Sequence, residues 1–227
     1  MRRATGIRIG AVLTAMRTGG RSLEIAELAV RWADRGVVGF DLAGAEAGFP
    51  PEHHRAAFDL VLTDGRLGLT IHAGEADGLA SIEGALACGA QRLGHGLRIA
   101  DDLVASTGGG VTVGPVAGAI RARGVPLELC PTSNVHSGAA PSIAEHPIGL
   151  LADLGFRVTV NTDNRLMSAT TQSRELAALS EAFAWDLDRI ERVTIDAAMS
   201  AFMPEEQRRA LVDETIRPGF EYARADG

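Results

Sequence analysis

Short apolar runs alternate with amphipathic segments of helical length along most of this chain. Each run is about five to eight residues long, is rich in Val, Leu and Ile, and is bounded by glycine or polar residues, as buried strands are. Between the runs, apolar residues such as Phe58, Val61 and Leu62 recur at helical spacing, which predicts helices with one buried face. The predicted strands are residues 7–14, 37–44, 67–72, 92–96, 126–130 and 156–163.

The helical segments have recognisable ends, since Ser22 can cap the first helix and Gly36 can end it. From about Thr171 onward the periodicity is helical without strands, which predicts a C-terminal helical cluster. Residues 101–124 are mostly helical in pattern, but the glycines at 108–110 interrupt them, and we interpret those glycines as a flexible loop because no Gly-Lys-Ser/Thr follows. The other predicted helices are residues 52–65, 82–89 and 148–155.

Apolar strands separated by helices predict a parallel sheet with helices packed outside it. A doubly wound sheet would bind its ligand at one switch point, whereas here polar residues follow several different strands, which favours a barrel. A closed barrel of this type needs about eight strands, and only six are predicted. We therefore predict one domain over residues 1–227, of α/β class. The predicted fold is an incomplete (β/α)8 TIM-type barrel with six parallel strands plus C-terminal helices.

Composition narrows the classes of partner. The 227 residues contain 22 Lys plus Arg and 29 Asp plus Glu, a formal charge of −7, which disfavours binding to polymeric nucleic acid. Arg8 and Arg17 bracket only a short apolar stretch, which predicts a strand rather than a secretory signal, and no run is long enough for a membrane span. Cys88 and Cys130 lie in separate apolar runs, as buried structural cysteines do. We therefore expect a cytoplasmic protein.

Chemically capable residues follow the predicted strands. Asp41 occurs in FDLAG, His72 and Glu75 in TIHAGE, His95 in RLGHG, residues 132–134 in ELCPTSN and Asp163 in VNTDN. A single histidine after a strand is more often structural than functional. Five strands ending in polar residues at one barrel face are harder to explain by packing, because apolar residues would fill those places with a smaller desolvation cost.

The motifs HAGE, GHG, CPTSN and NTD, in this order, resemble those of the adenosine deaminase family. The resemblance covers nearly the whole chain, and it implies that the six predicted strands are the third to eighth of the family's barrel. It implies a (β/α) barrel that uses Zn²⁺ to convert a purine nucleoside, adenosine or a relative, and water to the deaminated nucleoside and ammonia. It also implies that His72 and Asp163 are zinc ligands, that Glu75 is the proton-shuttling catalytic residue, and that His95 is the catalytic histidine beside the zinc-bound water.

For the substrate, the resemblance implies that the backbone N–H of Gly44 contacts a purine ring nitrogen and that Asp41 and Ala43 form the same wall. Asn164 stands where the family usually has a second aspartate that contacts another ring nitrogen. These roles are chemically consistent, since imidazole and carboxylate are good zinc ligands and zinc lowers the pKa of bound water to about 7.

The chain also departs from the family pattern, because none of its six histidines forms the His-x-His pair of the family's first strand. His53 and His54 are adjacent in a helix, where surface or packing roles suffice, and His136 follows the fifth strand. His146 precedes Pro147 at a helix start, where capping or simple exposure accounts for it.

Two ligands do not make a tight zinc site, because catalytic zinc usually has three protein ligands. A misassigned gene start, a second polypeptide that supplies two strands, and an inactive remnant are three explanations. The open sheet edges favour self-association or a second chain. A deaminase acting on adenine or another aminopurine is a further alternative, as is a fragment that binds a partner without catalysis.

Overall fold

The computed structural model describes residues 7–226, so the two ends of the predicted domain, residues 1–6 and 227, lie outside the described residues. Six parallel strands form one sheet in the order β1-β2-β3-β4-β7-β8. Every predicted strand is present, although the first begins and ends later than predicted. The strands are β1 (Ala11–Met16), β2 (Val37–Ala43), β3 (Gly68–Ala73), β4 (Arg92–His95), β7 (Leu127–Leu129) and β8 (Val158–Val160).

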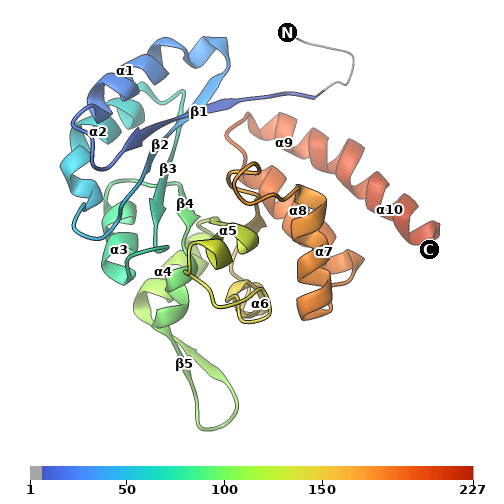
Figure 1. The fold of residues 1–227 in the computed structure, drawn as a ribbon. Coiled ribbons are helices and arrows are strands. Elements are labelled where there is room, and N and C mark those ends of the chain that lie inside the picture. The colour runs from blue at the N-terminus through green and yellow to red at the C-terminus, as the bar shows by residue number, and fades with distance from the viewer. Residues whose placement is uncertain (1–6, 227) are drawn as a thin grey trace.

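Helices follow each strand of the sheet and cover its outer face (Figure 1). The first half of the chain has α1 (Ser22–Arg31), η1 (Ala33–Arg35), η2 (Pro51–His54), α2 (Arg55–Asp64), α3 (Leu79–Ala87), η3 (Leu97–Asp102) and α4 (Pro115–Arg123). The second half has α5 (Pro131–His136), α6 (Ile148–Asp153), α7 (Gln172–Phe183), α8 (Leu187–Ser200), α9 (Glu205–Leu211), η4 (Val212–Ile216) and α10 (Arg217–Ala225). The predicted C-terminal helical cluster is therefore confirmed.

The helical pattern predicted for residues 101–124 is wrong over its first half. There the chain forms an antiparallel hairpin of β5 (Leu103–Ala105) and β6 (Val111–Val113), which projects from the molecule (Figure 1). The glycines at 108–110 lie at its tip, where the Ser106 N–H donates to the carbonyl of Gly110 at 2.8 Å. Cross-strand pairing of valine-rich segments around a glycine turn outweighs the apolar spacing that looked helical.

The two faces of the sheet differ in chemistry. Successive side chains of a strand point to opposite faces, and the outward set, such as Phe40, Leu69 and Leu93, is fully buried under the helices. The inward set is polar: Thr14, Asp41, Thr70 and Arg92 are aligned across β1, β2, β3 and β4. The interior of the curved sheet is therefore a polar surface on which chemistry can be arranged.

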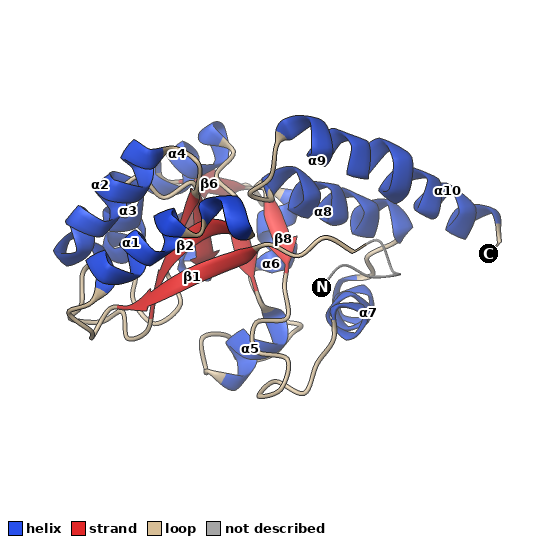
Figure 2. Ribbon diagram, turned by 90° about the horizontal axis from the view of Figure 1, so that it is seen from above, coloured by secondary structure: helices blue, strands red, loops and turns tan. Residues whose placement is uncertain are grey.

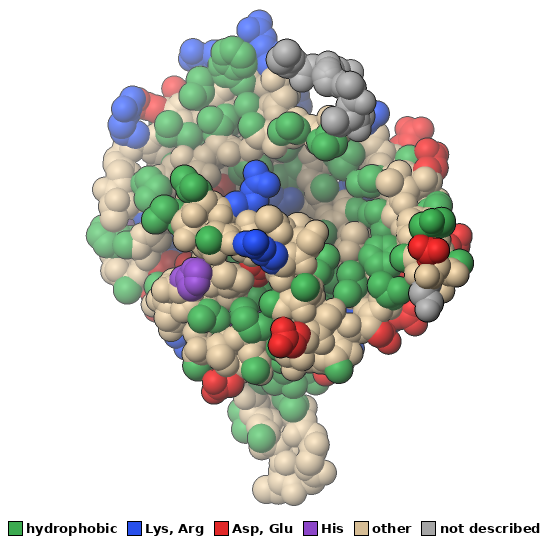
Figure 3. Space-filling view, turned by 45° about the vertical axis from the view of Figure 1, so that its right-hand side comes forward, with side chains coloured by type: hydrophobic (Ala, Val, Ile, Leu, Met, Phe, Trp, Pro, Cys, Tyr) green, Lys and Arg blue, Asp and Glu red, His purple; other side chains and the backbone are tan. Residues whose placement is uncertain are grey.

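The barrel is partial, because the sheet order leaves β1 and β8 without a partner strand on their outer sides among the described residues. Helices α1–α4 lie along one part of the sheet and α8–α10 lie beyond β8 (Figure 2). The face between the sheet and the C-terminal helices is hollowed, and basic side chains lie in the hollow (Figure 3).

Cys88 and Cys130 are both buried and form no disulfide, as expected. In the described part of the chain, no helix is long and apolar enough to cross a membrane.

Candidate active site

The carboxyl ends of the parallel strands bring the predicted site residues together at one end of the sheet. Asp41 on β2 accepts a hydrogen bond from Thr14 Oγ1 at 3.1 Å through Oδ2, and its Oδ1 lies 2.9 Å from Nδ1 of His72 on β3. The ring of His72 lies edge-to-face with that of His95 on β4, with 5.2 Å between the ring centroids. Residues from three neighbouring strands thus form one cluster.

A glycine on β4 makes room for the imidazole of His72. A Cβ at Gly94 would lie 2.9 Å from both Cγ and Nδ1 of His72, closer than real Cβ contacts come. The GHG sequence therefore places two imidazole rings. Its first glycine leaves space for the ring of His72, and its histidine contributes the ring of His95.

The Nδ1–H of His72 donates to Asp41, which turns Nε2 away from Asp41, the arrangement typical of metal-binding histidines. The side chain of His72 is 32% exposed. Burial disfavours its charged form, but the bond to Asp41 and the charges of Asp41, Glu128 and Asp163 outweigh this and raise the pKa of His72 to about 9. Since a zinc ligand must be neutral imidazole, a bound metal would have to displace that proton.

Glu75 and His95 face one another. Oε2 of Glu75 lies 3.3 Å from Nε2 of His95, and Oε1 accepts hydrogen bonds from Ser137 Oγ at 2.9 Å and from Asn134 Nδ2 at 3.2 Å. Burial is the main reason that the pKa of His95 lies below its ordinary value. The pair therefore combines a carboxyl group that can exchange protons with an imidazole held largely neutral.

Two of the four described residues other than glycine that have a positive φ lie at the same end of the sheet. His95 has φ of 60° and Asp163 has φ of 52°, in the left-handed region that residues other than glycine rarely adopt. Oδ2 of Asp163 accepts a hydrogen bond from Ser133 Oγ at 2.6 Å. Strained residues persist where the surrounding structure holds them and are frequent at functional sites, so this strain favours a functional role for both residues.

A buried carboxylate that sequence reasoning missed holds the loop that carries Glu75. Glu46, only 4% exposed, accepts hydrogen bonds from the backbone N–H groups of Gly74, Glu75 and Ala76 at 2.6, 2.8 and 2.6 Å, and from Ser81 Oγ at 2.6 Å. Burial opposes ionisation of Glu46, but these bonds outweigh it, so its pKa lies below its ordinary value. In the sequence, Glu46 is one more acidic residue in a glycine-containing turn, and no local pattern marks it as buried.

The remaining predicted residues are less closely tied to this cluster. Gly44 directly follows β2 with φ of 97°, a conformation that suits glycine. Oδ1 of Asn164 accepts from the backbone N–H groups of Leu166 and Met167, both at 3.1 Å, and so closes an exposed turn. The substrate contacts proposed for Asp41, Gly44 and Asn164 stay predictions, and the carboxylate of Asp41 is already bonded to His72.

Two of the other histidines, His54 and His146, are buried. His54 is buried and its ring nitrogens bond Ser22 Oγ and the carbonyl of Arg17, in line with the packing role expected of it. His146 is buried, so simple exposure is the wrong explanation for it; its Nδ1 accepts from the N–H of Ile148 at the start of α6, which is a capping contact. His136 ends α5 and is exposed.

The predicted zinc site is only partly supplied. The chemistry of His72 and Asp163 suits zinc, but residues 7–226 contain no group of three or more His, Cys, Asp or Glu side chains placed to hold a metal ion. A catalytic zinc ion usually needs three protein ligands, so the described residues do not by themselves fit the ion.

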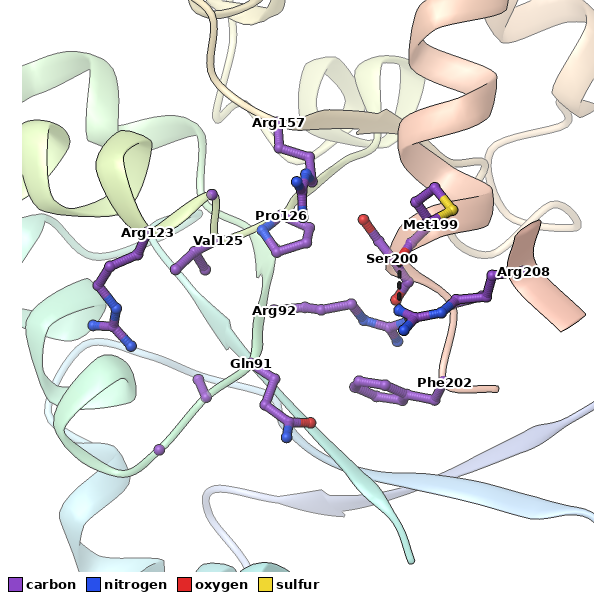
Figure 4. Close-up of a pocket in the computed structure, with 14 residues that line it drawn as sticks. Gln91, Arg92, Arg123, Val125, Pro126, Arg157, Met199, Ser200, Phe202 and Arg208 are labelled. Atoms are coloured by element: carbon purple, nitrogen blue, oxygen red, sulfur yellow. Dashed lines mark hydrogen bonds between the residues drawn. The ribbon is translucent and has the colours of Figure 1, made fainter. Parts of the chain in front are cut away.

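A cavity of about 460 Å³ lies at the opposite, amino ends of β4, β7 and β8. Arg92, Phe202 and Arg208 lie close together in it (Figure 4), with the Arg92 guanidinium 3.6 Å from the centre of the Phe202 ring. Barrel enzymes bind substrates at the carboxyl ends of their strands, so this cavity is not the candidate site.

Comparison with known proteins decides the family. Residues 1–218 match the adenosine deaminase family model. The chain belongs to the adenosine deaminase family. This confirms the resemblance inferred from HAGE, GHG, CPTSN and NTD.

Relatives in this family are closely similar in sequence. Adenosine deaminase 1 of Streptomyces coelicolor is 56% identical over 215 residues, which are 94% of this chain and 54% of that protein. The adenosine deaminase of Mycobacterium leprae is 55% identical over 94% of this chain and 59% of its own length. The chain therefore spans between half and three-fifths of the length of the curated adenosine deaminases it matches.

Solved structures confirm the fold. An adenine deaminase from Arthrobacter aurescens superposes with a TM-score of 0.80 at 23% identity, over 92% of this chain and 61% of that one. A zinc-bound amidohydrolase from Burkholderia ambifaria gives 0.78 at 19% identity, over 94% of this chain and 57% of that one. The predicted partial barrel of α/β type is confirmed.

Proposed function

We propose that this adenosine deaminase family chain supplies the acid–base half of a hydrolytic deaminase site, which converts adenosine or a related 6-aminopurine nucleoside and water to inosine, or its equivalent, and ammonia. The observation that carries the proposal is the pair formed by Glu75 and His95, 3.3 Å apart at the carboxyl ends of the strands and adjacent to His72. Family membership and the names of the curated relatives support the reaction.

The reaction needs protons at two places. The oxygen of water adds to the ring carbon that bears the amino group, the neighbouring ring nitrogen gains a proton, and the amino group leaves as ammonia after it too gains one. Glu75 can give a proton to the ring nitrogen as a carboxylic acid and take one from the adding oxygen as a carboxylate. The N–H of His95 can donate to that oxygen as negative charge develops on it.

Zinc, which the family implies, would supply activation of the attacking water. We propose that His72 and Asp163 are two of its ligands. Because the described residues offer no third ligand, we derive no step through the metal. A cytoplasmic setting agrees with two cysteines that form no disulfide.

Incubation with adenosine in zinc-containing buffer made with ¹⁸O water tests the reaction. We expect inosine that carries the label on its new ring oxygen, together with an equal amount of ammonia, since hydrolysis takes that oxygen from water. A folded chain that releases neither product excludes deamination by this chain alone, and an assembly of the kind proposed below that releases neither product contradicts the proposal. Faster conversion of adenine than of adenosine would assign the site to the free base.

Two sheet edges that have no partner strand within residues 7–226 support a second proposal, that the working form is an assembly with another polypeptide or a second copy of this chain. Met16 on the β1 edge is 54% exposed and Ile9, just before that strand, is 87% exposed. Exposed apolar edges of this kind favour strand addition. Light scattering on the purified chain measures its mass, and a monomer at all concentrations excludes self-association.

A further inference from the structure

A buried chain of hydrogen bonds lies behind the Glu75–His95 pair. It is made by Asn134 of α5 and by His146, which precedes α6, two helices that lie side by side (Figure 1). Asn134 is 0% exposed and His146 is 2% exposed, so neither side chain is available to solvent. Because buried polar groups persist only when they are satisfied, the direction of each bond in this chain can be worked out.

The direction is set at the far end by the backbone. The N–H of Ile148 donates to Nδ1 of His146 at 3.1 Å, so that nitrogen must offer a lone pair. Burial is the main reason that the pKa of His146 is lowered to about 4, so the ring is neutral near pH 7. Its one proton is therefore on Nε2, which lies 3.2 Å from Oδ1 of Asn134.

The amide of Asn134 has only one satisfactory orientation. Its Oδ1 accepts from His146 Nε2 and also from the backbone N–H of Cys130 at 3.2 Å. The reversed amide would place its NH₂ group against two donors, which excludes it. Its Nδ2 therefore points to the site, where it lies 2.9 Å from Nδ1 of His95 and 3.2 Å from Oε1 of Glu75.

We propose that Asn134 and His146 are positioning residues that hold His95 as the tautomer protonated on Nε2, the ring nitrogen on the side of Glu75. Nδ1 of His95 accepts the amide proton of Asn134, so the proton of the neutral ring is on Nε2, 3.3 Å from Oε2 of Glu75. This inference rests on the roles proposed above for Glu75 and His95, and assigns to His95 the part of hydrogen-bond donor rather than base.

The tautomer can be read directly by NMR on the chain labelled with ¹⁵N at histidine. Two-bond couplings between ring protons and nitrogens distinguish the Nδ1–H form, the Nε2–H form and the cation. We expect the Nε2–H form for both His95 and His146 at pH 7, with signals assigned by His95→Gln and His146→Gln. A wild-type His95 protonated on Nδ1 overturns the proposal, whatever any variant does.

Asn134→Asp supplies the decisive substitution. A carboxylate cannot donate to Nδ1 of His95, so we expect His95 to gain a proton there and to give the signal of the Nδ1–H form or of the cation. Ser137→Ala is the matched control, because it removes a bond to Glu75 Oε1 without touching either histidine. An Nε2–H form that survives in a folded Asn134→Asp variant also overturns the proposal.

If Asn134→Asp does not fold, His146→Gln and His146→Phe replace it. The glutamine can still donate to Asn134 Oδ1 and is expected to keep the tautomer of His95, whereas the phenylalanine cannot and is expected to lose it in part of the population. Equal His95 signals in the two variants contradict the proposal that His146 acts on His95 through Asn134. None of these measurements uses adenosine, so the expected tautomer in an assembled form that does not deaminate adenosine would refute the proposed function alone.

Discussion

The two sides of the candidate site are built very differently. On the acid–base side, Asn134 bonds Glu75, His95 and His146, and this chain of hydrogen bonds ends at the backbone of α6. On the metal side, His72 and Asp163 are each held by one neighbouring side chain and are more exposed. All members of the acid–base network lie between Glu75 and Ile148. The metal side offers two ligands among the described residues, whereas zinc needs about three. Acid–base geometry can therefore be fixed independently of the metal cage.

The largest expected effect tests whether the acid–base side carries the chemistry. In a preparation that deaminates adenosine, Glu75→Gln should lower turnover about 10²–10⁴-fold, because an amide neither gives nor takes the required proton. Steady-state kinetics measures the loss. Glu145→Gln, which changes an exposed carboxylate bonded to Ser142, is the matched control and should leave turnover unchanged. Turnover retained by Glu75→Gln would remove Glu75 from its role.

The next effect concerns the loop that carries Glu75. Glu46→Ala should lower the free energy of unfolding by about 3 kcal/mol, because several backbone donors lose a charged, buried acceptor. Glu46→Gln, which keeps one acceptor oxygen, should cost less. Urea denaturation followed by circular dichroism gives both values, and a loss below about 0.5 kcal/mol for Glu46→Ala would show that the loop holds itself.

Acid should weaken the acid–base side through His146. Its pKa is about 4 in the folded chain against an ordinary 6.5, so below pH 6.5 the unfolded chain binds a proton that the folded chain does not. The free energy of unfolding is therefore unaffected by His146 above pH 6.5, and it falls by about 2–3 kcal/mol as the pH approaches 4. Urea midpoints at several pH values, compared between wild type and His146→Gln, isolate this contribution. Parallel curves for the two proteins would contradict it.

On the metal side, removing zinc should matter little to stability. A site with two ligands binds weakly, so a chelator should shift the thermal midpoint of the purified chain by less than about 2 °C. Differential scanning calorimetry with and without chelator measures the shift. A shift of many degrees would mean that further ligands complete the cage and would break the contrast between the two sides.

The smallest effect concerns Asn164. Asn164→Asp keeps the oxygen that accepts from Leu166 and Met167, so stability should change by less than about 0.5 kcal/mol. In an active preparation, KM for adenosine should change about 2–10-fold and kcat less, as expected for one hydrogen bond to substrate. An unchanged KM would argue against a substrate contact here.

Much of the fold could be predicted from the sequence, because strand and helix periods are local. The six strands, the C-terminal helices and the order of the motifs were all readable in this way. The β5–β6 hairpin was not, since Leu103 and Val113 meet only through pairing across a turn. Helix α5 was also missed. The polar residues after Cys130 resemble the end of a strand, although Pro131 in fact begins a helix.

The residues of the candidate site also differ in how far the sequence predicts them. His72, Glu75 and His95 stand in recognisable motifs, whereas Glu46 and His146 become meaningful only through bonds to residues distant in sequence. A lone histidine before a proline and an acidic residue in a turn carry no signal of burial. Their partners are chosen by the folded sheet, which no local pattern specifies.

The hydrogen bonds between Glu46 and the loop after β3 also determine which segments can be exchanged between related proteins. When segments of related deaminases are recombined, the turn that follows β2 and the loop that follows β3 belong to one block, because one supplies the acceptor and the other the donors. A crossover placed between residues 46 and 74 preserves these hydrogen bonds only when both parents have a glutamate at position 46 and the same loop after β3. Library design for this family should therefore move the two loops together.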